Sequence, residues 1–406
     1  MKGKLMADVK LSEISIGQAG QSISRPALPL VAVAGTRGKS TVAWLLETML
    51  TASGRSVGLW CSTGVYIRGE RQEGELGPWS RVLEMVATGD LDVAIQELDT
   101  TMVAAVGLPE HVYPLAAVST LCGNNDECLI SPEAIQGARA QSIVARAVRP
   151  DGLLVLNADD QAVYAAADET AADVVLFALH RGNPLMRRHL EHGGFGVWVE
   201  DGTVVIGSAL DLREVVTVAE ANFALDGALI FQVQNLLCAV ALAVALDLPD
   251  SVIRRAVRDF NPEPDRLPGS CNILPVSGGT IVLDSVRQVW TLRSLIRGIR
   301  HQPKRRTVVV SGCFSHLPST QIAEAGRLLG RLGGVVILHS QDVHGPLIDV
   351  LMDGIAQNEI PPLVLTMPGE NQAIEHALRM IGEGDLCLLI TDDVPTAVGA
   401  IERFRG

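Results

Sequence analysis

The sequence has few aromatic residues, no excess of basic residues and no closely spaced pair of cysteines. Asp and Glu number 46 against 33 Lys and Arg, which leaves a formal net charge of −13. We therefore expect no nucleic-acid partner, because proteins that bind nucleic acid usually carry a basic surface. The seven cysteines are an odd count and include no Cys-x-x-Cys pair, which argues against a disulfide framework or a zinc knuckle. A reducing cytoplasm is the simplest setting.

Long hydrophobic runs are also missing. No uninterrupted apolar run reaches the roughly 18 residues that a membrane-spanning helix needs. Residues 1–29 lack the apolar core after a basic start that marks a signal peptide. We therefore expect neither a membrane span nor a secretory signal.

Small aliphatic residues are abundant instead. Of the 406 residues, 48% are hydrophobic and only 4% are aromatic, so Val, Leu, Ile and Ala must build the cores. The length allows two or three domains. This composition favours an α/β fold over a β-sandwich.

The stretch from residue 30 to residue 46 carries the strongest signal. An apolar β-branched run ends at Gly35, the turn Gly35-Thr-Arg-Gly-Lys-Ser40 follows, and a helical pattern opens at Thr41. Glycines in such a turn let backbone N–H groups approach phosphate oxygens, and the helix N-terminus adds positive dipole. The pattern predicts that Lys39 reaches the β and γ phosphates and that the Ser40 or Thr41 hydroxyl holds Mg²⁺.

The predicted phosphate contacts comprise Gly35, Thr36, Gly38, Lys39, Ser40 and Thr41. The strict eight-residue motif would place glycine at position 33, where this chain has Val33. The alternative is a glycine-rich turn before a helix with an exposed lysine.

Polar side chains follow three later apolar strands. Glu97 and Asp99 end the strand expected over residues 92–99, where a carboxylate could hold Mg²⁺ opposite the phosphate loop. A solvated strand end explains the same acids. Residues 124–127 offer oxygen ligands of the hard-cation type or form a polar turn. Asn157 and Asp160 are candidates to meet a nucleotide base or ribose.

A proline-rich segment divides the chain. Residues 261–269 contain three prolines, which cannot continue the helices expected on either side. Beyond it strands and helices alternate, which predicts a small doubly wound sheet. We expect a polar leader over 1–27, a central ATP-binding domain over 28–262 and a C-terminal domain over 263–406. One of these strands is expected over 335–339, and His339 and His344 flank the loop after it, where a surface loop is favoured over a metal site.

Taken together, these stretches resemble the Mur ligase family, and most closely the Mur-ligase-like half of cyanophycin synthetase. The similar segments are Gly35–Ser40, Gly64–Ile67, 150–160, 183–194 and Pro268-Gly269 with Asn272. With Arg37 inside it, the phosphate loop also resembles that of poly-γ-glutamate synthase. The likeness covers residue 28 to the end and includes no ATP-grasp half.

The resemblance implies a P-loop parallel-sheet domain followed by a Rossmann-like one. It also implies an enzyme that uses ATP and Mg²⁺ to phosphorylate a carboxylate, after which an amine attacks the acyl phosphate to form an amide. Lys39 would hold phosphates, while Ser40 and Glu97 would hold the metal. The substrates would be a small-molecule or peptide carboxylate and an amino acid. A homo-oligomer or a separate ATP-grasp protein would be the partner.

Several family positions are substituted. Residues 124–127 stand where the family has Asp-His, Gln141 stands at a lysine position, and Ser270 replaces an arginine. Two His-Asn pairs appear as Arg287-Gln288 and Phe231-Gln232.

Three functions fit this pattern. One is a ligase in which Arg37 or Arg287 supplies the missing positive charge, with Lys39, Arg37 and Glu97 as its catalytic residues. Another is a catalytically degenerate subunit that serves as scaffold or regulator of a partner enzyme. The third is a kinase or GTPase switch that uses Asp99, which would leave the cyanophycin-type similarities unexplained.

Overall fold

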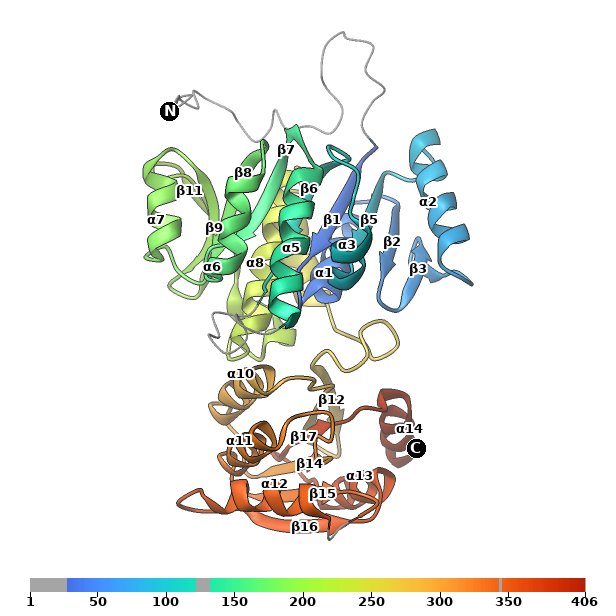
Figure 1. Ribbon diagram of the computed structural model, residues 1–406, viewed down its shortest axis with the longest axis vertical. Helices are drawn as coiled ribbons and strands as arrows, with labels where there is room; N and C mark the ends of the chain where they lie inside the picture. Colours follow the sequence, from blue (N-terminus) through green and yellow to red (C-terminus); the bar gives the residue numbers. More distant parts are fainter. Residues whose placement is uncertain (1–27, 122–131, 343–344, 406) are drawn as a thin grey trace. The chain divides into compact units, whose positions relative to one another are not determined.

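The computed structural model of the chain describes residues 28–121, 132–342 and 345–405. These residues form two compact units, each with its own sheet (Figure 1). The first unit contains residues 28–221 and 231–260, and the second contains 222–230 and the residues from 261 onward. The expected leader over 1–27 and the candidate oxygen ligands at 124–127 lie outside the described residues.

The sheet of the first unit has eleven strands among the described residues, in the order β11-β10-β9-β8-β7-β6-β1-β5-β2-β3-β4. The strands are β1 (Leu30–Ala34), β2 (Val57–Cys61), β3 (Gly64–Ile67), β4 (Glu70–Arg71), β5 (Val93–Glu97), β6 (Tyr113–Val118), β7 (Val148–Asn157), β8 (Asp173–Ala178), β9 (Phe195–Glu200), β10 (Thr203–Gly207) and β11 (Leu212–Thr217). In this spatial order, the neighbouring strands β9-β8-β7-β6-β1-β5-β2 pair in parallel. Antiparallel strands extend the sheet at both ends, β10 and β11 beyond β9, and β3 and β4 beyond β2.

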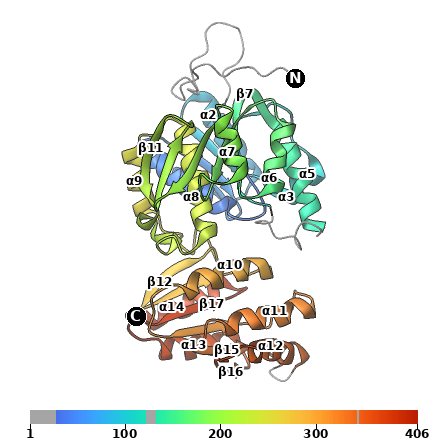
Figure 2. The ribbon, with the colours of Figure 1, turned by 90° about the vertical axis from the view of Figure 1, so that its left-hand side faces the viewer.

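Helices cover both faces of this sheet. They are α1 (Lys39–Ala52), α2 (Leu76–Thr88), α3 (Thr100–Val106), α5 (Pro132–Ala147), α6 (Gln161–Tyr164), α7 (Pro184–Glu191), α8 (Ile230–Ala245) and α9 (Asp250–Asp259). The views show α3, α5 and α6 on one face and α1, α8 and α9 on the other (Figures 1 and 2). The parallel strands are buried on both faces, which is why β1 is a continuous run of five buried apolar residues.

The second unit has a six-stranded sheet among the described residues, in the order β12-β13-β17-β14-β15-β16. Its strands are β12 (Asn272–Val276), β13 (Gly279–Asp284), β14 (Thr307–Ser311), β15 (Val335–His339), β16 (Leu363–Met367) and β17 (Leu386–Ile390). Its helices are α10 (Val289–Arg300), α11 (Ser319–Gly330), α12 (Pro346–Ala356), α13 (Glu370–Met380) and α14 (Val394–Arg405). All strand pairs except β12–β13 are parallel.

The α/β fold class predicted from the sequence is confirmed in both units. In the second unit α10, α11 and α12 pack in sequence along one face, while α13 packs with α14 on the other. This is the doubly wound arrangement expected from the alternating pattern. Among the described residues, no helix is both long enough and apolar enough to span a bilayer.

Candidate functional site

The phosphate loop joins β1 to α1 and needs glycine at two positions. Gly35 has φ +130°, and a Cβ there would lie 2.4 Å from the Ser119 hydroxyl. Gly38 has φ +82°, and its Cβ would lie 2.1 Å from the Asn235 side-chain oxygen. Both backbone conformations and both close approaches exclude other residues. The glycines of the sequence motif therefore set the path of the loop.

The loop is fixed by hydrogen bonds to neighbouring strand ends. The Thr36 N–H donates to the Thr120 carbonyl at 2.7 Å, and the Thr36 hydroxyl donates to the Leu121 carbonyl. Ser119 donates its hydroxyl to the Arg37 carbonyl at 2.7 Å. The loop is thus held in place by protein groups before any ligand binds, which is the preorganisation that anion binding at low cost requires.

Lys39, Ser40 and Glu97 meet at the carboxyl ends of β1 and β5. The Ser40 hydroxyl donates to Glu97 Oε2 at 2.8 Å. Lys39 Nζ lies 3.7 Å from Glu97 Oε1, with side chains 14% and 9% exposed. One cation, one hydroxyl and one carboxylate are therefore gathered beside the loop. Thr41 is buried, at 4% exposure, so Ser40 is the better placed hydroxyl for a metal.

Ser62 joins this cluster and was missed by the sequence analysis. It lies in the turn between β2 and β3, where its N–H donates to Glu97 Oε2 at 3.1 Å. Its hydroxyl lies 3.1 Å from that of Ser40. The only available signal was a polar turn after a strand, because strand pairing alone brings this turn to the end of β5.

The side chain of Arg37 contacts α8. Its guanidinium lies over the ring of Phe231, 5.5 Å from the centroid, in a cation–π contact with α8. In the same helix, Asn235 donates to the Gln232 side-chain oxygen at 2.9 Å, and both residues are buried. The first turns of α8 therefore position the arginine that the sequence analysis named as a second cation.

Asn157 and Asp160 lie at the end of β7, at 0% and 1% exposure. The Asn157 amide donates to the Ser119 carbonyl at 2.8 Å. The Asp160 carboxylate accepts from the Thr120 hydroxyl and the Leu121 N–H, each at 2.8 Å. Both side chains thus hold the turn that holds the phosphate loop. Contact of either residue with a nucleotide stays a prediction.

Asp159, between these two residues, was also missed. Its N–H donates to the Asn157 side-chain oxygen at 2.9 Å, and its carboxylate accepts from the Leu179 N–H at 2.6 Å and the Asn183 amide at 3.0 Å. It therefore joins the ends of β7 and β8 to the start of α7. Nothing in the sequence pattern distinguished it from its neighbour Asp160.

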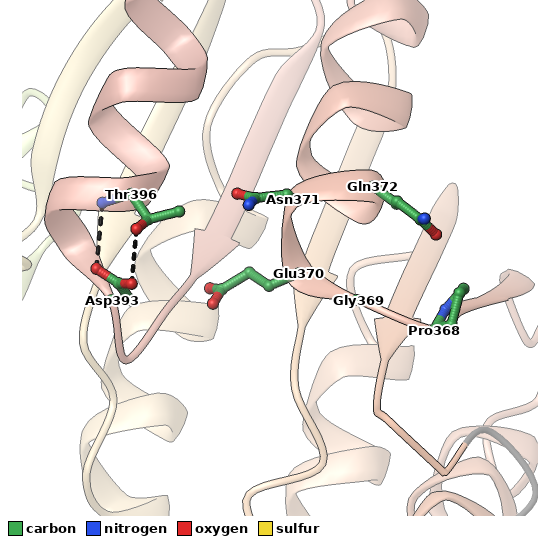
Figure 3. Close-up of a pocket in the computed structure, with 7 residues that line it drawn as sticks. All are labelled: Pro368, Gly369, Glu370, Asn371, Gln372, Asp393 and Thr396. Carbon is green, nitrogen blue, oxygen red and sulfur yellow. Dashed lines mark hydrogen bonds between the residues drawn. The ribbon is translucent and has the colours of Figure 1, made fainter.

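A second polar cluster lies at the carboxyl edge of the second sheet. Glu370 and Asp393 line an open cavity of about 410 Å³ at the starts of α13 and α14. Figure 3 shows the side chains of Glu370 and Asn371 directed toward Asp393 and Thr396. Burial raises the pKa of Glu370, and the nearby carboxylates Asp392 and Asp393 raise it further.

His339 is the last residue of β15, where the sequence pattern also ends this strand, but its side chain is not exposed in a surface loop. Its side chain is 15% exposed, and its Nε2 atom lies 4.0 Å from Glu370 Oε1. Burial lowers the pKa of His339. Arg287, the other candidate cation, has a side chain that is 66% exposed and lies 3.4 Å from Asp392.

The sequence pattern of the Mur ligase middle domain matches residues 33–243, which is more than half of the chain. The chain belongs to the Mur ligase family. The resemblance drawn from the phosphate loop and the central motifs is thereby confirmed. The match includes every element that carries the Lys39–Ser40–Glu97 cluster.

Curated relatives of this Mur ligase family member include two kinds of enzyme. It is 26% identical to cyanophycin synthetase of Synechocystis sp. over 388 residues, which cover 93% of this chain and 44% of that protein. It is 23% identical to the UDP-N-acetylmuramoyl-L-alanyl-D-glutamate--2,6-diaminopimelate ligase of Geobacillus thermodenitrificans, over 89% of this chain and 73% of that protein. The chain therefore spans less than half the length of the cyanophycin synthetases that it matches.

Solved structures share the fold across both units. E. coli FolC in complex with DHPP and ADP has a TM-score of 0.63 at 16% identity, covering 97% of this chain and 95% of that one. The UDP-N-acetylmuramoylalanyl-D-glutamyl-2,6-diaminopimelate--D-alanyl-D-alanyl ligase from Acinetobacter baumannii also has a TM-score of 0.63, at 14% identity, covering 93% and 76%. At these identities the likeness establishes the fold.

Proposed function

We propose that this Mur ligase family member is an ATP-dependent carboxylate–amine ligase that acts through an acyl phosphate. The single observation that carries the proposal is the cluster of Lys39, Ser40 and Glu97 beside a preorganised phosphate loop. A carboxylate oxygen of one substrate would attack the γ-phosphorus of ATP, and ADP would leave. An amine would then attack the acyl carbon and release inorganic phosphate.

The residues of the cluster divide the work of phosphate binding. Lys39 starts α1, so its ammonium and the first free N–H groups of the helix would contact the same phosphate oxygens. Arg37, held over Phe231, would supply the second positive charge for the transferred group. Two fixed cations lower the barrier because negative charge develops where they already point.

The oxygen atoms at the cluster suit Mg²⁺. The Ser40 hydroxyl lies 2.8 Å from Glu97 Oε2 and 3.1 Å from the Ser62 hydroxyl, and two hydroxyls with one carboxylate form an all-oxygen donor set of the kind that Mg²⁺ takes together with waters and phosphate. Bound there, Mg²⁺ would neutralise charge on the phosphates. No group of three His, Cys, Asp or Glu suited to a metal occurs among the described residues, so these oxygens are the candidate ligands in this unit.

The relatives suggest the substrate class. The name of the diaminopimelate ligase describes an amino acid joined to a peptide-bearing acceptor, and we infer that this chain joins an amino acid to a small-molecule or peptide carboxylate. No finding favours the alternative of a catalytically degenerate scaffold. A homo-oligomer, a separate ATP-grasp partner and a cytoplasmic location stay predictions.

The reaction is tested by ADP release from ATP and Mg²⁺ in the presence of acidic amino acids or acidic peptides and a panel of amino acids as amines. The proposal expects ADP that requires both substrates and matches amide formed one for one. Glu97→Gln is expected to lower this rate by about 100-fold or more. The exposed Glu70→Gln, on β4, serves as the matched control.

Two results would contradict the ligase. One is ADP release that no carboxylate and amine pair increases. The other is amide formation by Glu97→Gln at the wild-type rate.

A further inference from the structure

The helix α5 presents one buried polar atom that has no partner. Gln141 is 6% exposed, and its Nε2 donates to the Ala162 carbonyl in α6 at 2.6 Å. This bond fixes the orientation of the amide, so Oε1 points away from α6. Among the described residues, Oε1 has no hydrogen-bond partner. Leaving a buried acceptor unpaired is costly, so a missing partner is expected.

A small cavity adjoins Gln141. Its volume is about 10 Å³, and Gln141 lines it together with Gly35, Thr100 and a wall of apolar side chains that includes Val144. A cavity of roughly 10–15 Å³ on this measure holds one water molecule. The space thus has the size of a single water and is lined by the residue whose side-chain oxygen needs a donor.

The polar groups around this cavity are hydrogen-bond acceptors. The Thr100 hydroxyl already donates its proton to the Gly35 carbonyl at 3.0 Å, so only its lone pairs remain. The Gly35 carbonyl and Gln141 Oε1 are acceptors as well. An occupant must therefore bring at least two donor hydrogens, as a water molecule does.

We propose that one water molecule occupies this cavity and donates hydrogen bonds to Gln141 Oε1 and to Thr100 or Gly35. The water connects α5 and the start of α3 to the first glycine of the phosphate loop. It supports the loop at Gly35, in addition to the direct bonds from strand ends. The proposal goes beyond ligation, because the water is a feature of the free protein and is present whether or not the chain forms amides.

The direct test is a crystal structure of the full chain at about 1.8 Å resolution or better. The expected result is one density peak within hydrogen-bonding distance of Gln141 Oε1 and of Thr100 Oγ1 or the Gly35 oxygen. A dry cavity, or a reoriented Gln141 whose oxygen has a direct protein donor, overturns the proposal. Crystals soaked in rubidium chloride test for a cation, because an anomalous peak in the cavity also overturns it.

A double-mutant cycle tests the same water in solution. Val144→Ile adds a methylene to a lining residue and displaces the water, which leaves Oε1 unpaired in the wild-type background. Gln141→Met removes that acceptor, and its other cost, the lost bond to Ala162, cancels in the cycle. Val144→Ile is expected to raise the unfolding equilibrium constant about tenfold in the wild type and less than threefold beside Gln141→Met. Equal effects in both backgrounds contradict the water.

Discussion

The carboxyl edges of the two sheets both carry polar side chains, but the two sets are paired differently. At the first edge Ser40 and Glu97 bond each other, and Asn157 and Asp160 bond the backbone. At the second edge the facing atoms of His339 and Glu370 lie 4.0 Å apart, and neither has a hydrogen-bond partner among the described residues. These four side chains of the first edge are thus paired with protein groups, whereas His339 and Glu370 at the second edge are buried groups whose desolvation is not fully compensated.

This difference in pairing accounts for the shifted pKa values at the second edge. Burial moves the pKa of His339 down and that of Glu370 up, because burial disfavours the charged form of each group, and the hydrogen bond of Glu370 with Thr391 only partly offsets its shift. Fixed polar groups at the first edge suit phosphate, which needs donors already in place. Substitutions at the two edges should therefore differ in their effects on stability and on nucleotide binding.

The first edge should collapse if its loop glycine is changed. Gly35→Ala would place Cβ 2.4 Å from Ser119 Oγ at φ +130°, so we expect a loss of about 3–5 kcal/mol in unfolding free energy. Gly54→Ala is the control, because Gly54 has φ +88° with nothing near the added Cβ, and it should lose only ~1 kcal/mol. Urea unfolding of both variants measures the difference, and equal losses would show that the close approach to Ser119 is unimportant.

Removing a buried helix cap at the first edge should cost more unfolding free energy than removing an exposed cap at the second edge. Asp160→Ala removes acceptors for Thr120, Leu121 and the first turn of α6, and it should cost about 3 kcal/mol. Asp393→Ala removes a cap on the exposed turn before α14 and should cost less. Urea unfolding of each variant measures the two costs. If the exposed cap costs as much as the buried one, burial does not distinguish the two edges.

Arg37 should matter for nucleotide binding and hardly at all for stability. Arg37→Ala is expected to raise the Kd for ATP and Mg²⁺ about tenfold, a loss of ~1.4 kcal/mol, because one of two cations is removed. Arg81→Ala, at an exposed position on α2, is the control for loss of a positive charge. Calorimetric titration measures both, and an unchanged Kd would remove Arg37 from the site.

The smallest expected effect is the pH dependence of the unfolding free energy that His339 causes at the second edge. Since the pKa of folded His339 lies below its ordinary value near 6.5, the unfolded chain binds more protons just below that pH. Stability from this group is therefore complete above about pH 6.5 and decreases as the pH falls through that window. His339→Gln lacks this titrating group, so it should not lose this part of its stability on acidification. The unfolding free energy of the variant relative to wild type should therefore be more favourable at pH 5.5 than at pH 7.5.

Unfolding at the two pH values measures the change in this difference. A difference that is the same at pH 5.5 and pH 7.5 would show that His339 keeps its ordinary pKa in the fold.

Local sequence predicted the parts of the site that are close together in the chain. The strand, loop and helix around Lys39 follow from periodicity and glycine spacing, and Glu97 follows from its position at a strand end. Ser62 could not be found in this way, because its contact with Glu97 exists only after β2 pairs with β5. The opposite problem arose with Asn157 and Asp160, since polar residues at a strand tip look alike whether they face a ligand or a neighbouring turn.

The burial of single polar residues was equally hard to predict from the sequence. His339 was expected at a strand end beside a surface loop; it does end the strand, but its side chain is 15% exposed and its Nε2 atom lies 4.0 Å from Glu370 Oε1. Gln141 resembled a substituted family position, and its orientation toward Ala162 depends on how α5 packs on α6. Such pairings are set by tertiary packing, which a single sequence does not encode at short range.

Calorimetric titration of the full chain with ATP and Mg²⁺ tests the central claim most directly. Binding by the wild type in the micromolar range is expected, with affinity lowered at least about 30-fold by Lys39→Ala and unchanged by Arg81→Ala. Binding that Lys39→Ala leaves intact, or no binding by the wild type, would contradict a nucleotide site built on this loop.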